Sequence, residues 1–137
     1  MAQENVERHH RTYAAFNRRD LDAFLALMDD DVDAESVIVG VEGRYQGHER
    51  LRHLWNDLLG VWPDLTAQAV EVRDLGDVTV ADLRLHGRGA GSAIPTDVRL
   101  WVVARWRGGK CISWSDFGTE AEALEAVGSR SRRGESR

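Results

Sequence analysis

The residue of this sequence best suited to chemistry is Asp116, a carboxylate within a run of tryptophans and β-branched residues. On the strand pairing described below, it lies across from Trp101, shares a sheet face with Trp114 and comes diagonally near Arg99. Apolar surroundings raise the pKa of a carboxyl group, whereas a nearby guanidinium lowers it. Two interpretations stay open: Asp116 is a proton acceptor, or it pairs with Arg99 at a strand end for solubility.

This placement depends on a β-hairpin that we predict over Thr96–Phe117. Two runs of strand-forming residues flank Gly108-Gly109, and a two-residue glycine loop is a strong hairpin signal. If Arg107 faces Lys110, alternate residues fall on two faces of the sheet. Face one carries Val98, Leu100, Val102, Ala104, Trp106, Cys111, Ser113, Ser115 and Phe117, and face two carries Arg99, Trp101, Val103, Arg105, Ile112, Trp114 and Asp116.

Other reaction chemistries have little support in the sequence. The five histidines show no metal-ligand spacing, so we expect no metal site. The glycines at 87–92 are followed by Pro95 and a strand rather than by the helix that a dinucleotide loop requires. Cys111 lies on face one, away from Asp116, which gives nucleophilic catalysis no basis. His86 ends a strand beside the glycine loop, where it could reach a cavity mouth or simply be exposed.

Composition indicates one domain with one core in a chain of 137 residues. We expect a cytoplasmic protein, since a single cysteine forms no internal disulfide and neither a signal peptide nor a membrane-spanning run is evident. The whole chain carries a net charge of −5; the last nine residues carry four Arg and one Glu, so residues 1–128 sum to −8. Such an acidic body argues against nucleic-acid binding. Residues 129–137 are predicted to be a disordered basic tail after a domain at 1–128.

Periodicity predicts an α+β fold, in which helices pack on one face of a curved antiparallel sheet. In the first helix, Val6, Tyr13 and Phe16 share a stripe, with His9 or His10 filling the gap. The acidic run at 29–31 is predicted to be a solvated turn, because it lacks the ligand pattern of a calcium loop. We expect helices over 3–17, 21–28, 48–59 and 120–127, strands over 35–41, 66–75 and 78–86, a glycine-rich turn at 42–47, and the hairpin.

Several motifs resemble those of one family. They read Tyr-Ala-Ala-Phe-Asn-Arg-Arg-Asp-Leu-Asp at 13–22, Tyr-Gln-Gly-His-Glu at 45–49, Trp-Pro-Asp-Leu at 62–65, Gly-Arg-Gly-Ala-Gly-Ser at 87–92 and Trp-Ser-Asp-Phe at 114–117, before a terminal helix ending at Gly128. Together they resemble the SnoaL-like polyketide cyclase group of the nuclear transport factor 2-like superfamily, over most of residues 5–128.

The resemblance implies a cone-shaped, cystatin-like sheet around an apolar pocket lined by face two. Asp116 matches the acid–base aspartate of the cyclases on their last strand. The implied function is proton abstraction from a small hydrophobic carbonyl compound, without a cofactor; the alternative is a non-catalytic ligand-binding or accessory domain. The expected substrate-binding residues are Tyr13, Phe16, Trp55, His86, Arg99, Trp101, Val103 and Trp114.

The ketosteroid isomerases of the same superfamily are a poorer match. Their oxyanion-holding tyrosine falls at Thr12, with Tyr13 one step along, and their general-base aspartate falls at Ser36. Their second acid falls near Trp101 or Val102. Because these groups are absent at the matching positions, ketosteroid isomerase activity is not expected.

The resemblance also implies a homodimer. Helices cover one side of the sheet, so face one would expose a contiguous apolar patch, which monomers rarely tolerate. A twofold contact would bury that patch, with Trp106 as its anchor.

Overall fold

The computed structural model describes residues 2–38, 41–88 and 96–135. The helices are α1 (Ala2–Asn17), α2 (Leu21–Ala26), α3 (Gly47–Val61) and α4 (Glu120–Glu135). The strands are β1 (Met28–Ser36), β2 (Gly43–Gln46), β3 (Thr66–Asp74), β4 (Val78–Gly87), β5 (Thr96–Arg107) and β6 (Lys110–Phe117). No helix in these ranges is long and apolar enough to cross a membrane.

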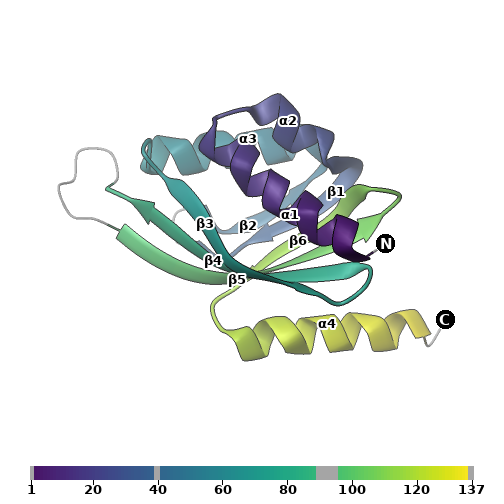
Figure 1. Cartoon of the computed structure of the whole chain (residues 1–137). Helices are drawn as coiled ribbons and strands as arrows, with labels where there is room; N and C mark the ends of the chain where they lie inside the picture. Colours follow the sequence, from purple (N-terminus) through teal and green to yellow (C-terminus); the bar gives the residue numbers. More distant parts are fainter. Residues whose placement is uncertain (1, 39–40, 89–95, 136–137) are drawn as a thin grey trace.

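The six strands form one curved sheet in the order β2-β1-β6-β5-β4-β3. Helices α1, α2 and α3 cover one face of the sheet, here called the inner face, and α4 lies along the opposite, outer face (Figure 1). The predicted α+β class, with a curved sheet packed against N-terminal helices, is therefore confirmed. One detail differs: β1 runs parallel to β6, while the other paired strands are antiparallel.

Side-chain hydrogen bonds hold α1 against the sheet. The Asn17 amide donates to the Ala67 carbonyl and accepts from the Ala67 N–H, both at 2.8 Å, as a strand neighbour would. The Arg19 guanidinium donates to the carbonyls of Phe16 and Leu65, at 2.9 and 2.7 Å. These bonds fix the last turn of α1 beside β3, and they set the position of the aromatic side chains along its inner stripe.

The acidic run at 29–31 lies within β1, so the prediction of a solvated turn there is wrong. Its carboxylates stand toward solvent, whereas Met28, Val32, Ala34 and Ser36 are buried. A period-two alternation was present from Val32 onward, but three consecutive acids obscured it. The predicted strand at 35–41 therefore begins too late, and the predicted glycine-rich turn at 42–47 contains the short strand β2.

The predicted two-residue loop of the hairpin is confirmed, but the predicted register is not. Arg107 pairs with Lys110 and Trp106 with Cys111, whereas Arg105 pairs with Ser113, so Ile112 is an extra residue in β6. A β-bulge of this kind reverses the face of every following residue. Consequently Trp114 and Asp116 share a face with Leu100, Val102, Ala104 and Trp106 rather than with Trp101 and Val103.

This bulge overturns the assignment of face one as the outer surface. The β5 residues Leu100, Val102, Ala104 and Trp106 are buried in the main core, under the helices, and Trp106 is 4% exposed. The predicted dimer contact through face one is therefore wrong, because those side chains are already covered. The homodimer itself stays a prediction.

Helix α4 covers the outer face of the sheet. Ala123 of α4 is fully buried there, in a second cluster with Val78, Val80 and Val103, and Trp101, Phe117 and Val127 pack around it. The helix was predicted to end at Gly128 but continues to Glu135; the predicted disorder of residues 129–137 stays a prediction. The glycine loop at 89–95 lies outside the described residues.

Candidate functional site

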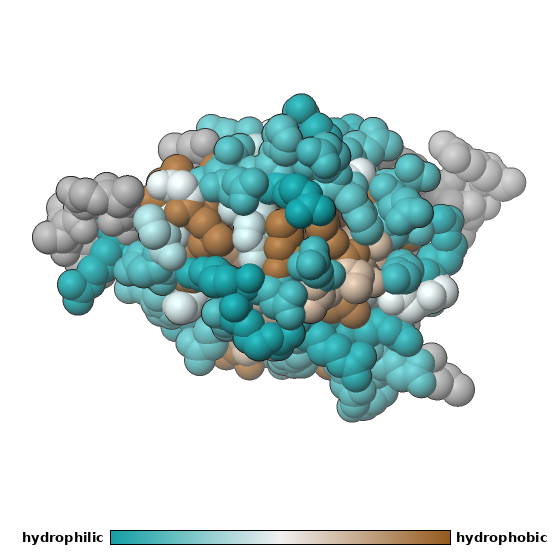
Figure 2. All heavy atoms as spheres, turned by 90° about the horizontal axis from the view of Figure 1, so that it is seen from above, coloured by the Kyte–Doolittle hydropathy of each residue, from teal (hydrophilic) through white to brown (hydrophobic). Residues whose placement is uncertain are grey.

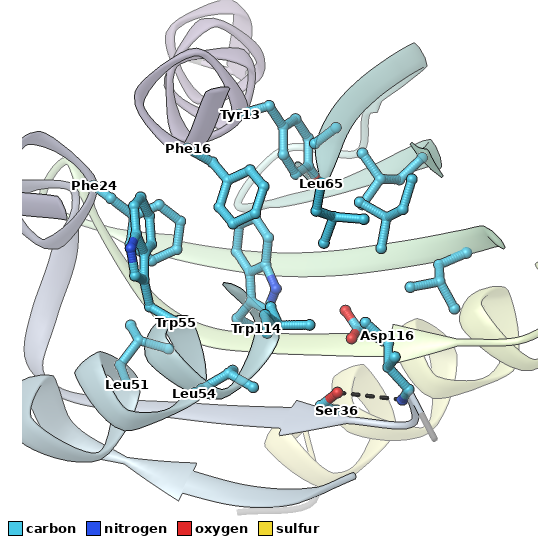
Figure 3. Close-up of a pocket in the computed structure, with 16 residues that line it drawn as sticks. Tyr13, Phe16, Phe24, Ser36, Leu51, Leu54, Trp55, Leu65, Trp114 and Asp116 are labelled. Carbon is cyan, nitrogen blue, oxygen red and sulfur yellow. Dashed lines mark hydrogen bonds between the residues drawn. The ribbon is translucent and has the colours of Figure 1, made fainter. Parts of the chain in front are cut away.

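A cavity of about 80 Å³ lies between the N-terminal helices and the inner face of the sheet. Most of its lining is aliphatic or aromatic, with Asp116, Tyr13 and Ser36 as the polar exceptions among the described residues. The remaining lining residues are Phe16, Phe24, Ile38, Leu51, Leu54, Trp55, Leu58, Leu65, Ala67, Leu83, Leu85, Leu100 and Trp114. Figure 3 shows the carboxyl group of Asp116 pointing into this space beside Trp114.

Aromatic contacts build the walls of the cavity. Phe16 of α1 meets Trp55 of α3 edge-on, with ring centroids 5.0 Å apart, and Phe24 of α2 lies 5.2 Å from the same indole. Tyr13 approaches Trp114 edge-on at 5.7 Å. Such tilted and edge-to-face pairs are the favoured geometry for aromatic rings. The cavity is therefore framed by side chains from three helices and from β6.

Asp116 is the acid of this cavity and is 8% exposed. Burial raises the pKa of its carboxyl group to about 7; the negative charge of Glu35 adds to the increase, and a hydrogen bond with the Ser36 hydroxyl opposes it. That hydroxyl also accepts from the Ile38 N–H at 3.3 Å (Figure 3), so its own proton is free to be donated to Asp116. A carboxyl group with a pKa near neutrality exchanges protons readily at physiological pH.

A buried chain of hydrogen bonds runs behind the cavity, and the sequence did not reveal it. The Trp106 indole donates to Thr79 Oγ1 at 2.9 Å, and Thr79 Oγ1 lies 2.7 Å from His9 Nδ1. The other ring nitrogen, His9 Nε2, lies 2.8 Å from the hydroxyl of Tyr13. The available signal was the spacing of His9 and Tyr13, four residues apart on one helix face, but nothing in the sequence placed Thr79 beside them.

Both titratable members of this chain are held neutral. Burial, aided by the positive charge of His10, lowers the pKa of His9 to about 3. Burial raises the pKa of Tyr13 well above its usual value, and the charges of Asp116 and Cys111 add to that increase. Tyr13 is therefore a neutral hydroxyl in the wall of the cavity, within electrostatic reach of Asp116.

Five of the nine predicted site residues line the cavity: Tyr13, Phe16, Trp55, Trp114 and Asp116. The other four lie elsewhere. Trp101 and Val103 pack under α4 on the outer face. Arg99 is exposed there, paired with Asp82 at 2.9 and 3.1 Å and stacked 4.6 Å from the Trp101 ring centroid. His86 is exposed and bonded to Asp97.

The structure thereby removes one reading of Asp116. Arg99 pairs with Asp82, so the predicted alternative of an Asp116–Arg99 surface pair is wrong. The reason is the bulge at Ile112, which turns Asp116 inward while Arg99 stays outward. The predicted register placed Trp114 on the same face as Trp101 and Val103. Because of the bulge, Trp114 instead shares a face with Leu100 and lines the cavity, whereas Trp101 and Val103 lie on the outer face.

Cys111 lies on the same sheet face as Asp116, contrary to expectation, because the bulge falls between them. Its thiol donates to the Ser113 carbonyl at 3.2 Å, and burial raises its pKa to about 12. A thiol so rarely ionised is a poor nucleophile. Within residues 2–38, 41–88 and 96–135, no group of His, Cys, Asp and Glu side chains could hold a metal ion.

The cavity is small for a ligand-binding site. Pockets that hold drug-sized ligands measure roughly 300–1,000 Å³, so a ligand of that size requires the lining side chains to move apart. Figure 2 shows hydrophobic residues reaching the surface between polar ones on the side covered by the N-terminal helices.

Solved structures share this fold. An NTF2-like protein of unknown function from Burkholderia pseudomallei K96243 superposes with a TM-score of 0.77 at 20% identity, covering 89% of this chain and 95% of that one. A putative SnoaL-like polyketide cyclase from Jannaschia sp. CCS1 gives 0.74 at 20% identity, with 90% of each chain covered. TerC, co-crystallised with polyporic acid, gives 0.72 at 21% identity, covering 89% of this chain and 96% of that one.

No curated protein matches the sequence significantly. The model of the SnoaL-like domain matches residues 9–114, which span α1 to Trp114 and so include most of the cavity lining. This match extends over more than half of the chain, and the fold agrees with it. The chain therefore belongs to the SnoaL-like domain family.

Proposed function

We propose that this protein binds a small apolar carbonyl compound in the cavity and uses Asp116 as its acid–base group. The observation that supports the proposal most strongly is the position of Asp116: a buried carboxyl group, with a pKa of about 7, facing an apolar space. A base with a pKa near the working pH combines a useful ionised fraction with a useful proton affinity. The putative polyketide cyclase and the polyporic acid complex among the similar folds are consistent with a hydrophobic oxygenated ligand.

The reaction we propose needs neither a metal nor a cofactor. The Asp116 carboxylate removes a proton from the carbon next to a carbonyl group; the C–H bonding electrons form a C=C bond, and the carbonyl π electrons move to the oxygen. Where a C=C bond is conjugated with the enolate, the enolate takes the proton back at the far end of that bond; otherwise its carbon attacks a second carbonyl group of the same molecule. In the second case Asp116 returns the proton to the new alkoxide, so charge and atoms balance.

Exchange of activated C–H protons with deuterated solvent tests this proposal. A panel of apolar cyclic ketones is incubated in D₂O, and NMR follows the loss of the protons next to the carbonyl group. We expect catalysed exchange by the wild type and a loss of about 100-fold or more in Asp116→Asn, the usual contribution of a general base. Equal exchange rates in the wild type and Asp116→Asn would contradict the proposal.

Asp82→Asn is the matched control, because this acid lies on the outer face of the sheet, paired with Arg99. It should exchange substrate protons like the wild type. A loss of exchange in both Asp116→Asn and Asp82→Asn would mean that the substitutions act by destabilising the fold, and it would contradict a specific role of Asp116 in the cavity.

A non-catalytic binding protein is the second candidate function. It is favoured by the sparse chemistry of the cavity, where Asp116 and Tyr13 are the ionisable side chains among the described lining residues. In that case the wild type binds members of the same panel, seen as ligand-induced thermal stabilisation, and gives no exchange above the rate in buffer.

A further inference from the structure

The hydrogen-bond chain behind the cavity has a direction that follows from donor chemistry. An indole nitrogen only donates, so Thr79 Oγ1 accepts from Trp106. Within the described part of the chain, the other partner of Thr79 Oγ1 is His9 Nδ1. If His9 Nδ1 carried the ring proton, Thr79 would accept two bonds and its own buried proton would have no acceptor. Thr79 therefore donates to Nδ1, because unsatisfied buried polar groups are costly.

The next step fixes the tautomer of His9. The ring is fully buried and uncharged at neutral pH, because burial disfavours the imidazolium. A neutral imidazole has one N–H, and when Nδ1 accepts, that proton lies on Nε2. His9 Nε2 therefore donates to the Tyr13 oxygen, 2.8 Å away.

The hydroxyl proton of Tyr13 consequently needs another acceptor. Across residues 2–38, 41–88 and 96–135, His9 is the hydrogen-bond partner of the Tyr13 hydroxyl, and it uses its own proton in that bond. Tyr13 lines the cavity, so a molecule within the cavity is the acceptor that remains.

We infer that Trp106, Thr79 and His9 act as a positioning chain that turns the Tyr13 hydroxyl into a hydrogen-bond donor for the cavity, and that the ligand carries a carbonyl-type oxygen to accept it. This inference rests on the proposed function for the identity of the ligand, but not for the direction of the chain. Tyr13 would polarise the carbonyl oxygen and stabilise the charge that gathers there when Asp116 removes the neighbouring proton. Since the pKa of Tyr13 is raised, the tyrosine keeps its own proton and stabilises the charge on the ligand oxygen by donating a hydrogen bond.

The tautomer of His9 is the first test and needs no ligand. In protein labelled with ¹⁵N-histidine, long-range ¹⁵N–¹H spectra separate protonated from unprotonated ring nitrogens. We expect His9 to show a bare Nδ1 and a protonated Nε2. Its signals should not titrate between about pH 5 and 8, where exposed histidines do. A proton on Nδ1 would overturn the inference, whatever the protein does with ligands.

Two substitutions at Thr79 show whether the chain sets the tautomer. Thr79→Ser keeps a hydroxyl that accepts from Trp106 and donates to His9, and it should preserve the wild-type spectrum. Thr79→Val keeps the shape and removes the hydroxyl, so His9 should populate both tautomers. If the Val variant is too unstable for spectra, Trp106→Phe removes the donor that forces Thr79 to accept, and it should loosen the same preference. An unchanged tautomer in whichever variant folds would contradict the role of the chain.

A pair of matched ligands then tests the donor itself. Cyclohexanone and methylenecyclohexane have the same shape and differ in an oxygen against a CH₂ group. We expect the wild type to prefer the ketone about tenfold, as one net hydrogen bond allows, and Tyr13→Phe to lose that preference. An equal preference in the wild type and Tyr13→Phe would overturn the inference.

The two proposals fail in different ways. If neither compound binds, the proposal that the cavity takes a carbonyl ligand is contradicted, and so is the inference that Tyr13 donates to one. The His9 spectrum still decides the direction of the hydrogen-bond chain. If the ketone is preferred and Tyr13→Phe abolishes the preference, but no proton exchange occurs, the donor stands and the catalytic role of Asp116 falls.

Discussion

The inner and outer faces of the sheet each carry an aspartate, and the two have opposite surroundings. Asp116 on the inner face lines an apolar cavity and, among the described residues, forms no ion pair with a cationic side chain. Asp82 on the outer face is held by the Arg99 guanidinium at 2.9 and 3.1 Å. Burial raises the pKa of Asp116 to about 7, whereas the hydrogen bond from Arg99 lowers the pKa of Asp82.

The difference shows how one carboxylate becomes reactive while another becomes structural. An ion pair at a surface holds its acid ionised and contributes little to stability. An unpaired acid in an apolar space destabilises the folded state once ionised, and it keeps a proton that it can exchange. The bulge at Ile112 decides which face Asp116 joins.

The largest effect should come from placing a charge on the inner face. Trp106→Glu puts an unpaired carboxylate where the indole is buried, and we expect a loss of at least about 4 kcal/mol in the free energy of unfolding. Chemical denaturation measures it. Trp101→Glu is the matched outer-face variant and should cost clearly less, because Trp101 is half-buried. An equal loss in the free energy of unfolding for Trp106→Glu and Trp101→Glu would contradict the assignment of Trp106 to the buried inner face and Trp101 to the outer face.

The pH dependence of stability separates the two aspartates by sign. The pKa of Asp116 is raised on folding, so its contribution is most favourable below its unfolded pKa near 4 and is lost as the pH rises through about 7. Relative to Asp116→Asn, the wild type should lose up to about 4 kcal/mol across that window. Denaturation at a series of pH values measures the difference.

Asp82 should behave in the opposite way. Because its pKa is lowered, the stability that it contributes relative to Asp82→Asn is present above the unfolded pKa and is lost as the pH falls through the folded one. The same dependence of stability on pH for the Asp116 and Asp82 comparisons would contradict the assigned surroundings.

The groups that act on the charge of Asp116 are Ser36, Glu35 and Tyr13. Because the hydrogen bond with Ser36 lowers the pKa of Asp116, Ser36→Ala should raise that pKa further.

A smaller effect is expected where α4 covers the outer face. Ala123→Asp introduces an acid at a fully buried contact, and we expect a loss of about 2–3 kcal/mol. Ala121→Asp, on the exposed side of the same helix, is the control and should be close to neutral. Indistinguishable melting temperatures for the two variants would show that α4 does not pack on the sheet.

The smallest effect should follow removal of residues 129–137. The segment contains no apolar residue, so deleting it should change the free energy of unfolding by no more than about 0.5 kcal/mol. A clear drop in melting temperature would show that the end of α4 contributes contacts that its sequence does not suggest.

Periodicity predicted most of the fold but not the register that orients the cavity. The stripes of α1 and α3 and the Gly108-Gly109 loop are local signals, and they predicted the helices and the hairpin. The bulge at Ile112 has no local signal, because an isoleucine is as suitable for a regular strand as for a bulge. One extra residue therefore inverted the predicted faces of β5.

The candidate site was predicted in part for a similar reason. Asp116 and the aromatic residues of α1 and α3 could be selected by chemistry and periodicity. Arg99 and His86 do not line the cavity; their partners Asp82 and Asp97 come from neighbouring strands, and no spacing rule in the sequence connects them. The contact between His9 and Thr79 spans 70 positions and becomes visible only in the folded chain.

The pKa of Asp116 is the quantity on which the account depends most directly. In protein labelled with ¹³C at the aspartate side-chain carboxyl groups, the Asp116 signal is assigned by its absence in Asp116→Asn and is followed through a pH titration. We expect a midpoint near 7, with Asp82 titrating below the usual value. A midpoint for Asp116 near 4, the ordinary value for aspartate, would contradict the buried acid and the proton chemistry built on it.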